Sequence, residues 1–385
     1  MEKLKPNSDI ELLRSFAIIM VLIQHYPALY FWSDNSAFLK LNNYISFWSG
    51  VDLFLCISGF VVSCGLINLI DNCKSNGISA SPAIKSFFIR RIFRLMPTSL
   101  LWITIMITMT YTYNISGAFG QSSWNILQAI SVLTYNYNYL AWYMQINKLP
   151  ATFGPFWSLN LEEQFYFILP FFVLFTSKKV RPLLLIAIIA IQFPIMRQGH
   201  TILNFRTDAL AWGVLLSILY MNGWTEKLQN LTCNKSVIRK LSILFLAGLM
   251  LCIPALNESG YMVGVLALFS AMLVLLATFD KALIYCPARA RKALLWVGAR
   301  SYSIYLIHMP VIYFIQETTA RYYLSKGMAP TESVLSMIVM MISSLTLTAL
   351  VVEGNFRFIE SPLRNYGRKI AKRVEEHKQK AISIA

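Results

Sequence analysis

Apolar runs of helix length recur along almost the whole chain, and this pattern limits what the chain can fold into. A helix needs about 20 predominantly apolar residues to cross the hydrocarbon core of a bilayer. Because polar or basic connections separate the runs, we predict an all-α fold, a polytopic membrane helix bundle of about ten transmembrane helices. The expected spans cover residues 12–30, 50–70, 95–112, 157–176, 182–196, 205–221, 241–256, 261–278, 294–314 and 334–352.

Composition favours one membrane domain over two soluble domains. The chain has 385 residues, of which 56% are apolar and 14% aromatic, and its mean hydropathy is +0.54. The first apolar run carries charge and lacks a clear small-residue cleavage site, so we expect it to remain as a membrane anchor. We expect the membrane domain to cover residues 1–365. A basic cytoplasmic tail without chemistry of its own would follow over residues 366–385.

The placement of basic residues indicates the orientation of the bundle. The net charge is +16, but no nucleic-acid motif accompanies it, so we exclude nucleic acid as a partner. With the N-terminus inside, most Lys and Arg residues fall on the cytoplasmic side, as the positive-inside rule requires. We therefore predict that both the N-terminus and the C-terminus are cytoplasmic. The basic residues left on the outer side are Lys40, Lys148, Arg197, Arg206, Arg321 and Lys326.

The stretch 124–143 resembles a further span, but charge placement argues against that interpretation. Counting it as a span would invert every later segment and move many basic residues outside. We predict an outer-face loop containing an interfacial or re-entrant helix. Its aromatic side chains suit a membrane interface, and they could also stack on sugar rings.

The cysteines show no pattern typical of a metal site. The six Cys residues form no CxxC pair and no metal-like spacing with His. We expect them to pack as apolar or reduced thiols, and we expect no metal cofactor.

Arg14 and His25 are ionisable residues inside the first expected span, where charges are costly and usually functional. Their separation corresponds to about 16 Å and roughly three helical turns, so both side chains share one face. His25 and Glu162 are expected at a similar depth from the outer side. A histidine can accept a proton from a hydroxyl, and a nearby carboxylate can orient it. The alternative is a histidine that only hydrogen-bonds between helices.

Further polar residues lie near the ends of the expected spans. Asp52, Arg206, Asp208 and His308 are on the outer side and are candidates for binding an acceptor, although Asp52 and Asp208 could simply cap helices. On the inner side, Arg91 and Arg94 are three residues apart on one helix face, a spacing that suits phosphate oxygens. Arg14, Arg90, Arg91 and Arg94 therefore predict a site for a soluble phosphorylated donor, with simple positive-inside anchoring as the alternative.

Several short strings, in this order, resemble the motifs of the acyltransferase-3 family, bacterial membrane acyltransferases that modify envelope and exported polysaccharides. The resemblance covers about residues 10–365. The strings are Leu13-Arg14 through His25-Tyr26, Gly50 to Phe54 with Ser58-Gly59-Phe60, Arg90 to Pro97, Trp157 to Tyr166, Arg206 to Leu210, Ser301 to His308, and Glu360-Ser361-Pro362.

The resemblance implies ten or more membrane helices and transfer of an acyl group, commonly acetyl, to a sugar hydroxyl. Arg14 and His25 correspond to the family's motif of an arginine and a histidine separated by ten residues. Arg91 and Arg94 match its arginine pair, and Glu162 matches its acid. Some relatives carry a C-terminal esterase-like domain, and we expect the acyltransferase domain alone here.

These observations predict a multi-pass O-acyltransferase of the bacterial cytoplasmic (inner) membrane, with acetyl-CoA as donor and a saccharide as acceptor. His25 would act as general base or acyl relay, with Glu162 orienting it and Arg14 guiding the donor. The alternatives are a transporter or flippase of a lipid-linked saccharide and a non-catalytic membrane scaffold. The particular saccharide, the length of the acyl group and the oligomeric state stay open.

Overall fold

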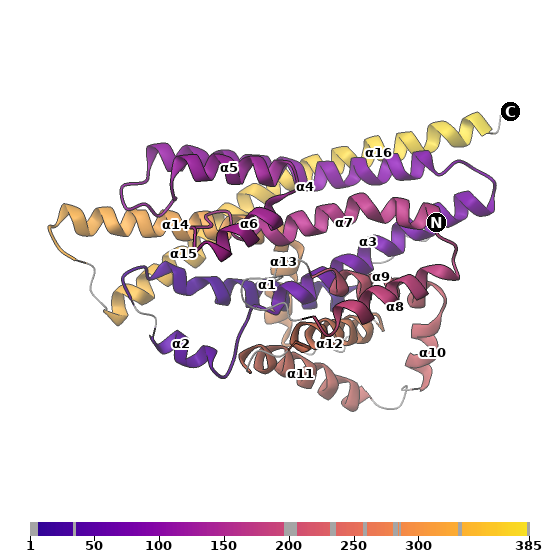
Figure 1. The fold of residues 1–385 in the computed structure, drawn as a ribbon, viewed down its shortest axis with the longest axis horizontal. Coiled ribbons are helices and arrows are strands. Elements are labelled where there is room, and N and C mark those ends of the chain that lie inside the picture. The colour runs from indigo at the N-terminus through magenta and orange to yellow at the C-terminus, as the bar shows by residue number, and fades with distance from the viewer. Residues whose placement is uncertain are drawn as a thin grey trace.

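The computed structural model describes residues 7–33, 36–195, 206–231, 236–256, 260–279, 284, 286–329 and 333–382. This part of the chain is helical and contains no strand, as the apolar runs predicted (Figure 1). The helices are α1 (Ser8–His25), η1 (Tyr26–Leu29), α2 (Ser36–Asn42), α3 (Gly50–Ser75), α4 (Ser81–Thr112), α5 (Ser122–Leu133), α6 (Tyr137–Ile146), α7 (Phe156–Phe175), α8 (Val180–Gln192), α9 (Thr207–Met221), α10 (Trp224–Leu231), α11 (Ser236–Cys252), η2 (Ile253–Ala255), α12 (Met262–Ala277), α13 (Ala288–Ala299), α14 (Ser301–Ser325), α15 (Val334–Asn355), the π-helical η3 (Phe356–Glu360) and α16 (Ser361–Ile382).

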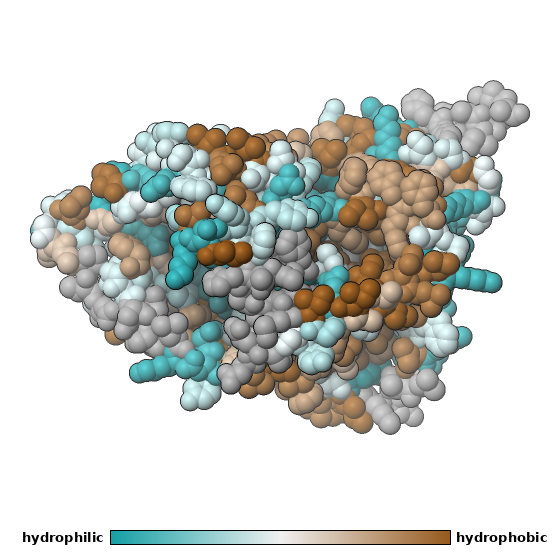
Figure 2. Space-filling model, viewed as in Figure 1, coloured by the Kyte–Doolittle hydropathy of each residue, from teal (hydrophilic) through white to brown (hydrophobic). Residues whose placement is uncertain are grey.

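The length and apolar character of the helices make this a multi-pass membrane protein. Within the described residues, five helical segments are long and apolar enough to cross a membrane. Shorter apolar helices accompany them, and large apolar side chains lie on the surface as well as inside (Figure 2). The five long segments are Ser8–Leu29, Gly50–Ser75, Ser81–Thr112, Val237–Ala255 and Val334–Glu376.

Helix α3 lies at the centre of the bundle and packs against α1, α7, α9 and α12. Its crossing with α9 is unusually close because glycines face each other there. A Cβ atom at Gly59 would collide with the carbonyl of Leu210, and one at Gly213 would collide with the carbonyl of Cys56. The two backbones can approach this closely only because neither position carries a side chain.

Helices α5 and α6 form a pair of short helices beside α4 and α7. Each is too short to cross a bilayer. At the turn between them, the Tyr135 hydroxyl lies 3.5 Å from the Met96 sulfur. Met96 is 16 residues, about 24 Å, before the end of α4 at Thr112. The turn therefore lies about halfway along α4.

The structure corrects the start of one predicted span and shows how the C-terminal segment packs. The span expected over 294–314 is wrong in its start, because the helix is interrupted at Arg300, between α13 and α14. Helix α13 instead packs across α1, with Gly298 against the carbonyl of Glu11. At the C-terminal end, the domain boundary expected at residue 365 falls inside α16. This helix packs along α4, where Gly367 lies against Phe93.

Candidate functional site

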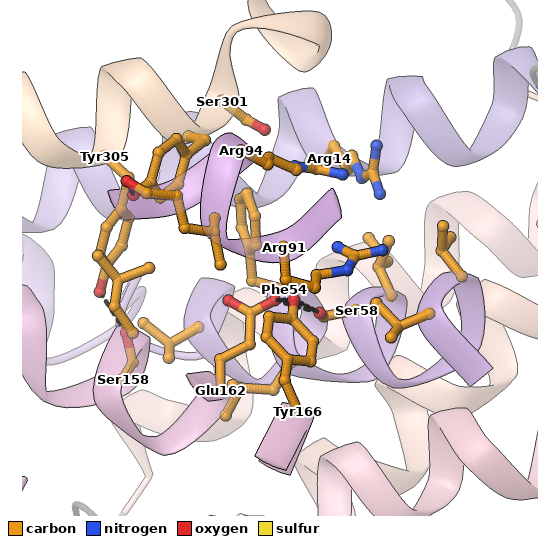
Figure 3. A pocket seen from close by; sticks show the side chains of 18 residues that line it. Arg14, Phe54, Ser58, Arg91, Arg94, Ser158, Glu162, Tyr166, Ser301 and Tyr305 are labelled. Carbon is orange, nitrogen blue, oxygen red and sulfur yellow. Dashed lines mark hydrogen bonds between the residues drawn. The ribbon is translucent and has the colours of Figure 1, made fainter. Parts of the chain in front are cut away.

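A pocket lined by both charged and apolar side chains opens among α1, α3, α4, α7 and α14, where segments far apart in the sequence meet. It brings together three of the arginines expected to bind a donor, Arg14, Arg91 and Arg94, with Glu162. Figure 3 shows Arg14 and Arg94 on one side of the pocket, and Tyr305 with Ser158 on another. The enclosed space at its centre is about 50 Å³.

The carboxylate of Glu162 is held by two hydroxyl groups in this pocket. Ser58 Oγ and Tyr166 OH both donate hydrogen bonds to Glu162 Oε1, and these hydroxyls lie 2.7 Å from each other. The Arg91 guanidinium lies 5.0 Å from the centre of the Tyr166 ring. A carboxylate held beside several arginines can act as their counter-charge, while each arginine retains donors for a ligand.

Of the predicted donor-binding arginines, Arg14, Arg91 and Arg94 line the pocket and Arg90 does not. The Nη1 of Arg14 donates to Glu11 at 2.7 Å. The Arg90 guanidinium instead pairs with Glu375 of α16 at 2.8 Å and donates to Ser86. One residue along a helix is a rotation of about 100°, so Arg90 faces α16 while Arg91 faces the pocket. The geometry therefore does not support the donor-binding role predicted for Arg90.

His25 lies next to His308, with ring centroids 5.1 Å apart. The Nδ1 of His25 is 2.8 Å from the carbonyl of Val21, and the Nδ1 of His308 is 3.2 Å from that of Ile304. A carbonyl oxygen can only accept, so each neutral ring carries its proton on Nδ1 and leaves Nε2 as the basic nitrogen. Among the described residues, the buried Nε2 of His308 has no hydrogen-bond partner.

The orientation of His25 differs from the prediction. A carboxylate, Glu162, was expected to orient the imidazole, whereas the backbone carbonyl of Val21 accepts the Nδ1 proton. Glu162 lies with the arginines. Tyr305 connects the two regions, since it lines the pocket and its ring centroid is 5.9 Å from that of His308. Tyr305 is itself fixed by Ser158, 2.6 Å from its hydroxyl.

Two of the residues expected on the acceptor side, Asp52 and Arg206, form a closed ion pair. Arg206 Nη1 donates to Asp52 Oδ2 at 2.8 Å, and both side chains are at most 1% exposed. The Arg206 guanidinium also lies over the Trp48 ring at 4.5 Å. Asp208 is equally buried. Asp52 and Asp208 occupy the first turns of α3 and α9, where a negative charge stabilises the helix dipole. The geometry therefore favours a structural role for Asp52, Arg206 and Asp208.

Sequence reasoning did not assign roles to the hydroxyl groups of this site. Ser58, Tyr166, Tyr305 and Ser158 all lie within the family-like strings, but those strings do not say which member faces inward. No group of His, Cys, Asp or Glu that could hold a metal ion occurs among the residues that the structure describes.

Comparison with known proteins identifies the family. A family model described as an acyltransferase domain matches residues 7–352. The chain belongs to the acyltransferase-3 family. O-acetyltransferase OatA of Staphylococcus aureus strain NCTC 8325 / PS 47 is 26% identical over 386 residues, which cover 93% of this chain and 57% of OatA. SAS0844 of strain MSSA476, which is named as a provisional O-acetyltransferase, is 26% identical over 394 residues, 96% of this chain and 59% of SAS0844.

This chain of the acyltransferase-3 family therefore spans less than two thirds of the length of these relatives. No solved structure matches it.

Proposed function

We propose that this protein is a membrane O-acyltransferase that transfers an acetyl group from acetyl-CoA to a hydroxyl of a cell-envelope or exported saccharide. The observation that carries the proposal is the continuity of one site. Arginines suited to a phosphorylated donor line the pocket, and Tyr305 in its wall leads to the His25–His308 pair. The O-acetyltransferase names of the relatives support the same reaction type.

The proposed topology has ten crossings of the bacterial cytoplasmic membrane, with both termini cytoplasmic. Basic residues that lie toward one end of the molecule support this orientation. There Arg181 pairs with Asp71, and Arg90 pairs with Glu375. In this orientation Arg14, Arg91 and Arg94 face the cytoplasm, where acetyl-CoA is available, and His25 lies toward the outer half of α1. We assign residues 1–365 to the acyltransferase domain, with the part of α16 that packs on α4 as its extension.

In the proposed reaction, Arg91 and Arg94 bind the donor phosphates and Arg14 guides the thioester arm toward His25. The acceptor hydroxyl loses its proton to His25 Nε2, and its oxygen forms a bond to the thioester carbonyl carbon. The carbon–sulfur bond then breaks, and the CoA thiolate takes the proton from the imidazolium. Alternatively, His25 could take the acetyl group from CoA in a first step and pass it to the acceptor hydroxyl in a second step, with the same overall products. The narrow centre of the pocket, about 50 Å³, holds only a few waters, so donor binding requires the arginine side chains to move outward.

Transfer of label from radioactive acetyl-CoA by the purified protein in nanodiscs tests the proposal. With a membrane glycan fraction as acceptor, we expect label to enter the glycan in an ester that hydroxylamine releases. His25→Ala should abolish this incorporation while the folded protein is retained. Full incorporation by His25→Ala would remove the proposed base, and movement of a labelled saccharide without acetylation would indicate a transporter.

A further inference from the structure

Two adjoining grooves between α4 and α7 form a channel along the outside of the helix bundle, on a surface that would face lipid. The first has a volume of about 670 Å³ and begins beside Lys85. The second, about 680 Å³, ends at the α5–α6 turn beside Met96. The grooves adjoin each other, since Phe88 and Ile92 line both, and we treat them together as one channel. Each volume lies in the range of ligand-binding sites.

Most of the wall of this channel is apolar and exposed, and the polar side chains Asn136, Glu163 and Gln164 line only the second groove. Ile92 is 50% exposed, Phe167 63% and Ile168 60%. In a multi-pass membrane protein such a face meets lipid chains. From Lys85 to Met96, α4 rises about 16 Å, close to half the thickness of a bilayer core. The channel thus has the length and polarity to hold one acyl chain of a single leaflet.

The two ends of the channel differ in chemistry. At the end nearer the start of α4, Lys85 is exposed and Ser79 and Ser81 add hydroxyl groups. A lysine at the membrane surface attracts anionic headgroups. Toward the other end, Arg91, Leu95 and Tyr166 line both this channel and the central pocket. Tyr166 donates to Glu162, so the wall between the two spaces is part of the candidate site.

We propose that this channel binds an anionic phospholipid, with its headgroup at Lys85 and one acyl chain between α4 and α7. The bound chain supports Arg91 and Tyr166 from the side opposite the donor pocket. The lipid is a bound ligand and not the acyl acceptor. This site depends on the chain crossing a bilayer, but not on the identity of the acceptor or on the chemistry proposed for His25.

Native mass spectrometry of the purified protein in mixed micelles tests the site, with phosphatidylglycerol and chain-matched phosphatidylcholine as probes. The wild type should retain phosphatidylglycerol preferentially. Ile92→Trp fills the channel and should lower retention about tenfold. Lys85→Ala should lower the preference for phosphatidylglycerol about fivefold. Leu345→Trp on lipid-facing α15 and Lys179→Ala at the start of α8 are matched controls, and both should bind as the wild type does.

Equal retention by the wild type and Ile92→Trp would overturn the site, and so would equal retention of both lipids by the wild type. Phe171→Trp narrows the first groove and replaces Ile92→Trp if that variant does not fold. Because binding is measured without donor or acceptor, loss of the lipid site and loss of the proposed acyltransferase activity are scored separately.

Discussion

The buried pair between Asp52 and Arg206 allows a direct test of the structural role assigned to it. Replacing Arg206 with Met keeps similar volume but removes the cation, the hydrogen bond to Asp52 at 2.8 Å and the contact with the Trp48 ring. Both charged side chains are at most 1% exposed, so water cannot replace the lost partner. Breaking a buried pair by removing one charge costs about 3–5 kcal/mol.

A loss of this size is a large fraction of a stability of about 5–15 kcal/mol. We therefore expect Arg206→Met to unfold at a much lower denaturant concentration, measured by tryptophan fluorescence in detergent micelles. The double variant Asp52→Asn with Arg206→Met should recover part of the loss, because no carboxylate is left without its cation. Lys372→Met removes the exposed pair with Glu376 and serves as a control, with an expected change below about 1 kcal/mol.

The opposite pattern would refute this reasoning. If Arg206→Met unfolds like the wild type while the KM for the acceptor rises, Arg206 contacts the acceptor, as its sequence position suggested. A fall in stability with an unchanged acceptor KM in the remaining folded enzyme supports the structural pair.

Other substitutions separate the roles of neighbouring residues. Arg91→Ala should raise the KM for acetyl-CoA about tenfold or more, because it loses a charge-assisted phosphate contact. Arg90→Ala should leave that KM unchanged, because Arg90 only forms a partly exposed pair with Glu375 that is worth at most about 1 kcal/mol. Equal effects of the two variants on steady-state kinetics would contradict the geometry. Gly213→Ala should destabilise the α3–α9 crossing by about 1–3 kcal/mol in the same denaturation assay, while Gly248→Ala, where a Cβ meets open space, should not. Glu162→Gln keeps an acceptor for Ser58 and Tyr166 but removes the charge, so we expect weaker turnover with little loss of stability; wild-type turnover would exclude a role for that charge.

The sequence predicted the helical class and the positions of most helices because hydrophobic run length is a local property. It failed where a boundary depends on tertiary contacts. The run over 294–314 is continuous in hydropathy, yet the chain turns at Arg300, where Gly298 lets α13 cross α1. The tail beyond residue 365 reads as solvated because it is basic, yet α16 packs along α4 and Glu375 pairs with Arg90.

The candidate site was predictable in its members but less so in their partners. Position near the inner ends of the spans grouped Arg14 with Arg90, Arg91 and Arg94, and the structure places all of these except Arg90 in one pocket. Depth alone grouped Glu162 with His25, but rotation about the helix axis decides which neighbour a side chain meets. Glu162 meets Ser58 and Tyr166, and His25 meets its own backbone and His308. The rotation of each helix about its axis depends on how the helices pack, and this packing could not be inferred from the sequence pattern alone.

The charge balance of the central pocket connects donor binding to stability. Three arginines and one glutamate line it, and Glu162 is held by hydroxyls instead of forming a close pair with Arg91 or Arg94. Clustered cations in a low-dielectric site repel one another, and a polyanionic donor relieves that repulsion. Donor binding should therefore stabilise the fold, by about 2.7 kcal/mol at a hundredfold excess over Kd. Arg91→Ala and Arg94→Ala should each reduce the rise in Tm that acetyl-CoA causes while raising the Tm of the free protein. If both variants instead lower the Tm of the free protein, the arginines stabilise the pocket through pairs already formed, and the donor is not needed as their counter-charge.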